Sequence, residues 1–213
     1  MKLYLNTISD LLWNSLNTIM NIEEFNDFRL VGGTSLSLQL SHRESTDIDL
    51  FTDVDYGSID FNKLEKILIQ TFPYVEAVFK GDVAMGTSFF IGNHEKDAVK
   101  LDLFYTDPFV FPPIQYDNIR LSSIEEITAM KLEVIAQGGR KKDFWDLHEL
   151  LEKFTLDQMI HFYLKRYPYS LSKKELLARI IDFSEAEDDF LPNCYKDKDW
   201  ENIKLDFIEL IEK

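Results

Sequence analysis

Apolar residues recur along the chain with two different spacings. Residues 5–20 carry them three or four positions apart, as on one face of a helix, whereas residues 98–105 alternate apolar and polar side chains, as on a strand. Helices are expected at residues 5–20, 61–68, 122–137, 140–153, 155–166, 172–184 and 199–212. Strands are expected at residues 28–31, 46–52, 75–80, 85–92 and 98–105. The pattern predicts an α+β fold, with a mixed sheet flanked by helices and a helical C-terminal half.

The last three expected strands are separated only by short turns, at Gly81-Asp82 and at residues 92–95. Short turns join antiparallel neighbours, so this part of the sheet is expected to be a meander. Residues 34–40 allow two interpretations, because Leu36, Leu38 and Leu40 alternate as on a strand while a hydroxyl after two glycines suits a helix start. We expect the helix.

Three prolines, Pro108, Pro112 and Pro113, interrupt the pattern near the middle of the chain. We place a boundary there, between a sheet domain at residues 1–112 and a helical region at residues 113–213 that contributes to the active-site cleft. Helix starts follow at Ser122 and Ser123, which are candidate N-caps with acids in the next turn.

Composition narrows the class of protein. With 213 residues and 45% hydrophobic residues the chain can bury a real core, and no apolar run approaches the roughly 18–20 residues of a membrane span. The single Cys194 excludes an internal disulfide, so a cytoplasmic location without membrane association is expected. The net charge of −15 disfavours broad non-specific binding to nucleic acid. Acidic residues gather after Asp182, as a solvated surface or, alternatively, as a docking surface for a basic partner.

Three aspartates are the candidate metal ligands. Asp47 and Asp49 lie two positions apart in an expected strand, so both point to one face, and two such close carboxylates repel unless a cation lies between them. Mg²⁺ binds one or two carboxylates together with substrate phosphates. Asp102 lies on a strand face in another apolar run and would join this site if the two strands are neighbours. The alternatives are a capping pair at a strand end and a surface acid.

Residues Gly32, Gly33, Thr34 and Ser35 are the candidate phosphate-binding segment. Glycines let backbone N–H groups approach a phosphate, and a helix start adds a favourable dipole. The segment lacks the spacing of the common glycine-rich nucleotide motifs, so its meaning depends on the nearby aspartates. Arg43 lies between the two elements and suits a phosphate or carboxylate ligand, or is a surface arginine.

Two further cationic positions belong to the candidate site. Lys131 lies within an expected helix between apolar residues, as a triphosphate partner or as a solvated lysine. Arg140 begins the densest basic run of the chain, which leads into Asp143 and Asp146 on one helix face. Asp143 is a candidate proton acceptor or orienting group, or an acid favoured by the helix dipole.

Four blocks together resemble the nucleotidyltransferases of the AbiEii/AbiGii toxin family, within the DNA-polymerase-β-like superfamily. They are "LVGGTSLSLQLSHR", "STDIDLF", "VKLDLF" and "MKLEVIAQGGRKKDFWDLHELL", and they span residues 30–151. The resemblance implies phosphate binding by Gly33, Thr34 and Ser35, a metal at Asp47, Asp49 and Asp102, and activity that depends on Lys131 and Asp143. The family often has Arg directly before that last Asp, where this chain has Lys142; Arg140 is the candidate substitute.

The expected activity is a metal-dependent nucleotidyl transfer. The expected enzyme moves NMP from an NTP to a hydroxyl acceptor, with tRNA or another RNA as a candidate, and releases pyrophosphate. Mg²⁺ is the expected cofactor, with Mn²⁺ as the alternative. The resemblance implies the toxin of a toxin–antitoxin pair, with an antitoxin protein as partner. A small-molecule nucleotidyltransferase and a non-catalytic binding protein that retains the fold are the alternatives.

Overall fold

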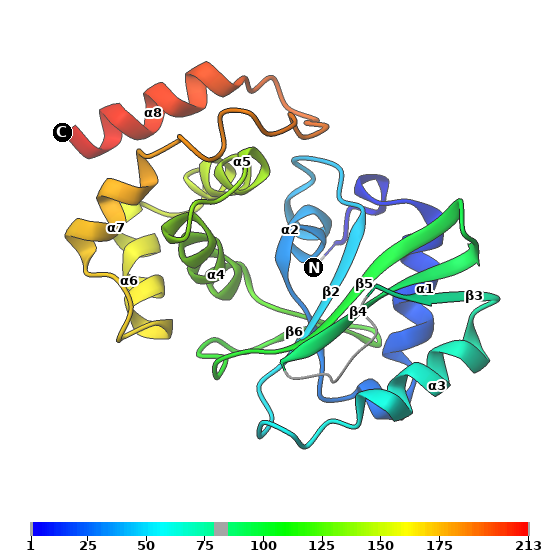
Figure 1. Ribbon diagram of the computed structural model, residues 1–213. Coiled ribbons are helices and arrows are strands. Elements are labelled where there is room, and N and C mark those ends of the chain that lie inside the picture. The colour runs from blue at the N-terminus through cyan, green and yellow to red at the C-terminus, as the bar shows by residue number, and fades with distance from the viewer. Residues whose placement is uncertain (1, 79–84, 213) are drawn as a thin grey trace.

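A computed structural model describes residues 2–78 and 85–212 and shows a seven-stranded sheet with the strand order β3-β4-β5-β2-β1-β7-β6 in that part of the chain (Figure 1). The strands are β1 Arg29–Leu30, β2 Asp47–Thr52, β3 Tyr74–Ala77, β4 Gly86–His94, β5 Asp97–Tyr105, β6 Ile114–Tyr116 and β7 Ile119–Leu121. The helices are α1 Asp10–Met20, α2 Gly32–Leu40, α3 Phe61–Thr71, α4 Ile124–Ala136, α5 Lys141–Leu150, α6 Leu156–Arg166, α7 Lys173–Ile180 and α8 Trp200–Glu212. Short 3₁₀ turns lie at Leu5–Thr7 and Glu23–Phe25.

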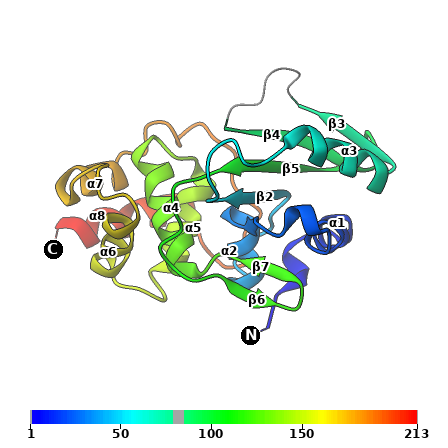
Figure 2. The same ribbon diagram turned by 90° about the horizontal axis from the view of Figure 1, so that it is seen from below.

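The sheet is mixed, as expected. Strands β3, β4 and β5 pair antiparallel as a meander, which confirms that prediction, and β5 then pairs parallel with β2. The expected turn at Gly81-Asp82 lies outside the described residues. Figure 2 shows the strands following one another from β3 and β4 to β6, with β5 and β2 in the middle. The parallel pair puts Asp49 opposite Asp102, so the condition for a shared site is met.

Side chains alternate along a strand, so the two faces of β2 contact different parts of the molecule. Ile48 and Leu50 are fully buried in a core that the sheet shares with α1 and α3. Asp47, Asp49 and Phe51 point the other way, toward the helical half of the molecule. The period of two therefore separates a core face from a face that carries the acids.

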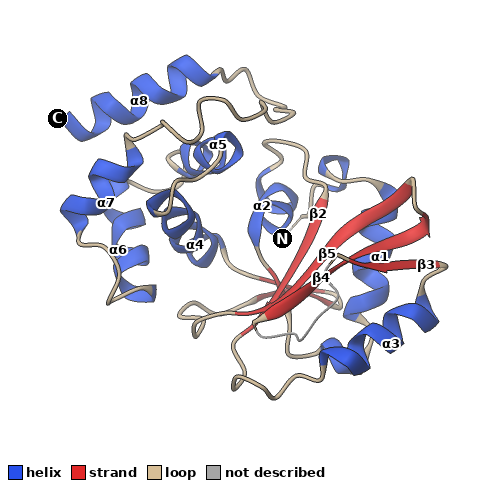
Figure 3. Ribbon diagram, in the orientation of Figure 1, coloured by secondary structure: helices blue, strands red, loops and turns tan. Residues whose placement is uncertain are grey.

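A second core lies within the helical half. It joins Leu36 of α2 to apolar side chains of α4–α8, with Phe144, Tyr163 and Phe207 among its fully buried members. Figure 3 shows these helices gathered on one side of the strands, with α1 and α3 on the other. The acid face of β2 consequently lies between two separately packed layers.

The hairpin β6–β7 was missed from the sequence. It pairs antiparallel within itself, and β7 pairs parallel with β1, so the sheet continues to Leu121 beyond the expected boundary at residues 112 and 113. Strands of three residues contain too few alternations to stand out as a period. The turn between them places Asp117 at φ +49, a left-handed conformation that Asp adopts more readily than most residues.

The segment after β1 forms a helix, as expected, but it begins earlier than expected. α2 starts at Gly32 with Val31 as its N-cap residue, so Thr34 lies inside the first turn. Of the helices in the described part of the chain, none combines the length and apolar character that a membrane span requires.

Candidate active site

Three aspartates from adjacent strands line one cavity. Asp47 and Asp49 of β2 and Asp102 of β5 face a cavity of about 650 Å³, which α2, α4 and the start of α5 complete. Burial, and then the neighbouring carboxylates of Asp102 and Asp47, raise the pKa of Asp49 to about 6. Burial is the largest cause of this shift and the two carboxylates add to it, so a cation beside Asp49 would favour its ionised form.

The carboxylates that could bind a metal ion here form part of a metal site rather than a complete one. Among the described residues, no group of three or more Asp, Glu, His or Cys side chains is arranged to hold a metal ion. Asp102 accepts a hydrogen bond from Ser88, and the Nζ atom of Lys100 lies 2.6 Å from its Oδ2 atom. Asp47 and Asp49 remain as the donor pair, which is chemistry that Mg²⁺ accepts when phosphate and water supply its other oxygens.

The two glycines let the start of α2 approach the acids. Gly32 has φ +66, and a Cβ atom there would lie 2.5 Å from the Oδ2 atom of Asp49. A Cβ atom at Gly33 would lie 2.5 Å from the Nη2 atom of Arg43. The first N–H groups of a helix have no acceptor within it, so this close approach presents donors beside the carboxylates.

The hydroxyls that follow the glycines point into the fold. Thr34 is fully buried and donates to the backbone carbonyl of Asp47, with Ser45 Oγ 2.8 Å away. Ser35 is also fully buried, 3.2 Å from the side-chain nitrogen of Gln39. Neither residue lines the cavity, so the expectation that these hydroxyls contact a phosphate has no support in this geometry. Thr34 instead helps to hold the backbone of β2.

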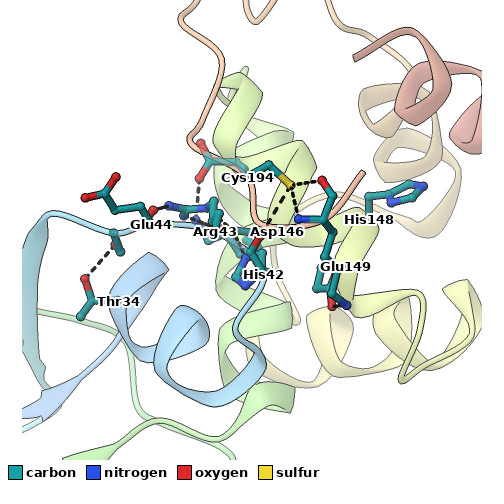
Figure 4. A network of polar contacts seen from close by, with 12 residues as sticks. Thr34, His42, Arg43, Glu44, Asp146, His148, Glu149 and Cys194 are labelled. Carbon is teal, nitrogen blue, oxygen red and sulfur yellow. Dashed lines mark hydrogen bonds and ion pairs between the residues drawn. The ribbon is translucent and has the colours of Figure 1, made fainter. Parts of the chain in front are cut away.

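A buried carboxylate, Asp146, joins α5 to the segment between α2 and β2. It accepts two hydrogen bonds from the guanidinium of Arg43, at 2.6 and 2.8 Å, and its Oδ1 atom lies 2.7 Å from Nε2 of His42. Figure 4 shows His42 and Arg43 turned toward Asp146. Arg43 is only 3% exposed, so the interpretation as a surface arginine was wrong. Sequence reasoning missed His42, whose only local signal is its position beside Arg43.

Lys131 lies between two carboxylates. Its Nζ atom is 2.6 Å from Asp143 and 2.6 Å from Asp146. Burial alone would lower its pKa, but these carboxylates raise the pKa of Lys131 above its usual value. The pKa of Asp146 lies well below its usual value, because Arg43 and Lys131 outweigh the effect of burial. Lys131 is therefore charged and buried, at the wall of the cavity.

Asp143 also accepts a hydrogen bond from the backbone N–H of Arg140, at 3.0 Å. This is the contact of an acid in the first turn of a helix, so the helix-dipole interpretation of Asp143 describes its geometry. Its carboxylate is buried, and Lys131 outweighs burial to lower its pKa. The geometry assigns Asp143 a positioning contact to Lys131.

Arg140 and Lys142 are two cations of the cavity that are open to solvent. Arg140 is exposed, and Lys142 lies 3.9 Å from the Oδ2 atom of Asp47. Burial, followed by repulsion from Arg140 and Lys131, lowers the pKa of Lys142. Asp47, Asp49 and Asp102 thus lie at the strands with Lys100, and Lys131, Arg140 and Lys142 lie across the cavity with Asp143. Carboxylates facing Arg140 and Lys142 are a distribution suited to a metal-bound polyphosphate.

Comparison with solved structures identifies the class of fold. JHP933 from Helicobacter pylori is similar over 98% of this chain and 90% of its own, with a TM-score of 0.57 at 17% identity. MenT4, a nucleotidyltransferase toxin from Mycobacterium tuberculosis H37Rv, is similar over 88% of this chain and 76% of its own, with a TM-score of 0.57 at 15% identity. The mixed sheet and its helical half therefore form a nucleotidyltransferase fold.

Sequence comparison identifies the family. Residues 15–213 match the family described as nucleotidyl transferase AbiEii toxin of type IV toxin–antitoxin systems. The chain belongs to this family, and it is a nucleotidyltransferase. An uncharacterized protein from Aquifex aeolicus (strain VF5) is 31% identical over 173 residues, which are 80% of this chain and 75% of that protein. The resemblance noted from residues 30–151 is thus confirmed over most of the chain.

Proposed function

We propose that the protein transfers NMP from an NTP to a hydroxyl group of an RNA acceptor, with Mg²⁺ as cofactor and Mn²⁺ as the alternative. One observation supports this most directly. Asp47 and Asp49 share a strand face with Asp102 beside them, and that face opens into a cavity whose other wall carries cations. Carboxylates opposite cations across one cavity suit a metal–triphosphate pair.

The residues proposed to bind the metal and those proposed to bind the phosphates lie on different walls of the cavity. Asp47 and Asp49 are the proposed metal ligands, and Mg²⁺ would supply positive charge to the phosphate oxygens and orient them. The backbone at Gly32 and Gly33 is proposed to contact the phosphates, and Lys142 and Arg140 to neutralise the leaving pyrophosphate. Lys131 and Arg43 are held in place by Asp146, and the charges of Asp143 and Asp146 balance theirs, so the net positive charge of this wall comes from Lys142 and Arg140.

The proposed reaction is a single displacement at the α-phosphorus. The acceptor hydroxyl oxygen forms a bond to that phosphorus, the bond to the β-phosphate oxygen breaks, and its electron pair leaves with pyrophosphate. The hydroxyl proton passes to a carboxylate, for which Asp102 is the candidate because it shares the acid face; its Oδ2 atom would exchange the contact with Lys100 for this proton. A toxin with this activity would inactivate its RNA acceptor, and an antitoxin protein would prevent that damage.

The experiment uses total RNA, each α-³²P-labelled NTP in turn, and the purified full chain with Mg²⁺ or with EDTA. Wild-type protein should label RNA only with the metal, and the double variant Asp47→Asn, Asp49→Asn should lose at least about 100-fold of the rate. Asp55→Asn is the matched control, because Asp55 lies exposed in the loop after the same strand. Wild-type labelling by the double variant, or by the wild type in EDTA, would contradict the proposal. If a small-molecule hydroxyl acceptor added to the assay is labelled and RNA is not, the alternative of a small-molecule nucleotidyltransferase is supported.

A further inference from the structure

A second cavity, of about 290 Å³, lies beside the first. Both cavities are lined by Arg43, Ser45, Asp47, Arg140 and Lys142. The proposed metal ligand Asp47 and the cations Arg140 and Lys142 therefore lie where the two cavities meet. A group held in the second cavity would lie next to Asp47, which is where an acceptor hydroxyl has to arrive.

The outer wall of the second cavity is the segment 189–193, which lies far along the chain from Asp47. At one end of this segment, Lys141 Nζ donates to the backbone carbonyls of Glu187 and Asp189, at 2.7 and 2.9 Å. At the other end, Asn193 donates to the carboxylate of Glu44 at 2.7 Å, and the N–H of Glu44 donates to the carbonyl of Asn193 at 2.9 Å. The segment is thus attached to α5 and to the segment before β2.

Between these attachments the chain exposes apolar side chains. Phe190 is 91% exposed and Leu191 is 66% exposed, although both line the second cavity. Single exposed apolar residues are common on proteins, but Phe190 is an exposed aromatic residue that lines a cavity together with Arg140 and Lys142. Three carboxylates, Glu44, Asp47 and Asp189, also line this cavity, and the first and last accept hydrogen bonds from Asn193 and from the N–H of Lys141.

We propose that the second cavity is the acceptor subsite, and that it holds the terminal nucleotides of a single-stranded RNA 3′ end. A base stacks on the ring of Phe190, and the terminal hydroxyl points toward Asp47. Backbone phosphates share Arg140 and Lys142 with the pyrophosphate, because both residues line both cavities. An aromatic ring beside cations is the usual combination for single-stranded nucleic acid. The proposal rests on the proposed function, for which it supplies the acceptor site.

The size of this site favours a strand end over a duplex. A cavity of about 290 Å³ lies at the lower limit of about 300–1,000 Å³ for ligand sites, so it accommodates a terminal nucleotide rather than a duplex. The chain carries a net charge of −15, so a polyanion has to bind where cations are concentrated. Arg140 and Lys142 belong to the densest basic run of the sequence.

The experiment separates the acceptor from the NTP. For Phe190→Ala, Phe190→Tyr and wild type, KM for RNA is measured at saturating NTP, and KM for NTP at saturating RNA. Phe190→Ala should raise the KM for RNA by about five-fold or more, the loss of one stacked base, while the KM for NTP stays within about two-fold. Phe190→Tyr should restore the wild-type value, because the ring is kept. Tyr169→Ala is the matched control, since Tyr169 is 99% exposed in a turn away from both cavities.

Each outcome has a distinct meaning. If wild type labels RNA but Phe190→Ala leaves the KM for RNA unchanged, the acceptor subsite is wrong and the proposed function stands. An equal rise in both KM values would also overturn it, because stacking of the acceptor does not predict weaker NTP binding. Wild type that labels no RNA overturns the proposed function, and the subsite with it. Because Phe190 is exposed, its replacement leaves no internal cavity, and equal urea midpoints verify that the variant is folded.

Discussion

Gly32 and Asp49 approach each other so closely that position 32 has no room for a side chain. A Cβ atom at position 32 would lie 2.5 Å from a carboxylate oxygen of Asp49. Gly32 also has φ +66, where a residue with a Cβ atom is strained by about 1–2 kcal/mol. Strain and steric conflict both act at the proposed metal site.

The first prediction separates these two effects. Gly32→Ala should lower stability and should also remove nucleotide transfer, because Asp49 has to move. Gly57→Ala is the control: Gly57 has φ +86, but a Cβ atom there would meet nothing within 4 Å, so this variant should lose only about 1 kcal/mol and keep its activity. Urea unfolding and RNA labelling measure both. Equal activity in the two variants would contradict the contact argument.

The second prediction concerns the charge of Asp49. Its raised pKa means that ionisation of this buried carboxyl costs folding free energy, and the cost grows between pH 3.8, the unfolded value, and about 6, the folded one. In EDTA, Asp49→Asn should therefore be more stable than wild type by on the order of 1–3 kcal/mol above pH 6, and the difference should fade as pH falls to about 4. Added Mg²⁺ should stabilise only the wild type. A less stable variant at pH 7 would refute this explanation.

At the scale of elements, the buried carboxylate of Asp146 connects helix α5 to the neighbouring parts of the fold. Asp146 takes its three partners from two places: His42 and Arg43 from the connection between α2 and β2, and Lys131 from α4. Such a network aligns the cation-bearing wall of the cavity with the acid-bearing strand. Removing the acid would leave buried cations without their partner.

The third prediction follows from that arrangement. Asp146→Ala should lower the free energy of unfolding by about 3–5 kcal/mol, whereas Asp157→Ala, which breaks an ion pair with an exposed Lys173, should cost less than about 1 kcal/mol. Because the pKa of Asp146 is lowered, its contribution is complete above pH 3.8 and is lost as pH falls through the folded pKa, well below that value. Urea unfolding at pH 7 and in acid measures both effects. Equal losses at pH 7 in the two variants would show that the network does not stabilise the fold.

The elements also show what local patterns can predict. Long helices such as α4 and α6 were expected within a few residues of their observed bounds, because an apolar period over ten or more residues is a strong signal. The hairpin β6–β7 has strands too short to show a period, and its place in the sheet depends on the distant β1. These two strands form because β7 pairs with both β6 and β1, and not because of a pattern within their own residues.

At the scale of the whole molecule, the net charge of −15 repels an RNA strand, whereas the cations near the cavity attract it. An RNA strand that uses mainly Arg140 and Lys142 makes about two phosphate contacts, so the slope of log affinity against log salt should be about −1.4. Fluorescence anisotropy with a single-stranded oligoribonucleotide measures it, and Arg140→Gln should reduce the slope by about 0.7. Lys173→Gln, on α7, should leave it unchanged. A wild-type slope steeper than about −4 would indicate a broad basic surface instead.

The sequence by itself determined the acid pair and its face. A strand has a period of two, so Asp47 and Asp49 share a side once the apolar positions between them are buried, and this needs no knowledge of distant residues. The same local logic predicted most helices. The four blocks of the resemblance then identified the family before any geometry was known.

Only the tertiary structure decided which groups meet. It placed Asp102 opposite Asp49, turned the Thr34 hydroxyl inward, paired Arg43 and Lys131 with Asp146, and brought segment 189–193 beside Glu44. These contacts join residues 11 to 149 positions apart, and they depend on how the layers of the fold pack. Local periodicity carries no record of that packing, because it reports only which face of an element is apolar.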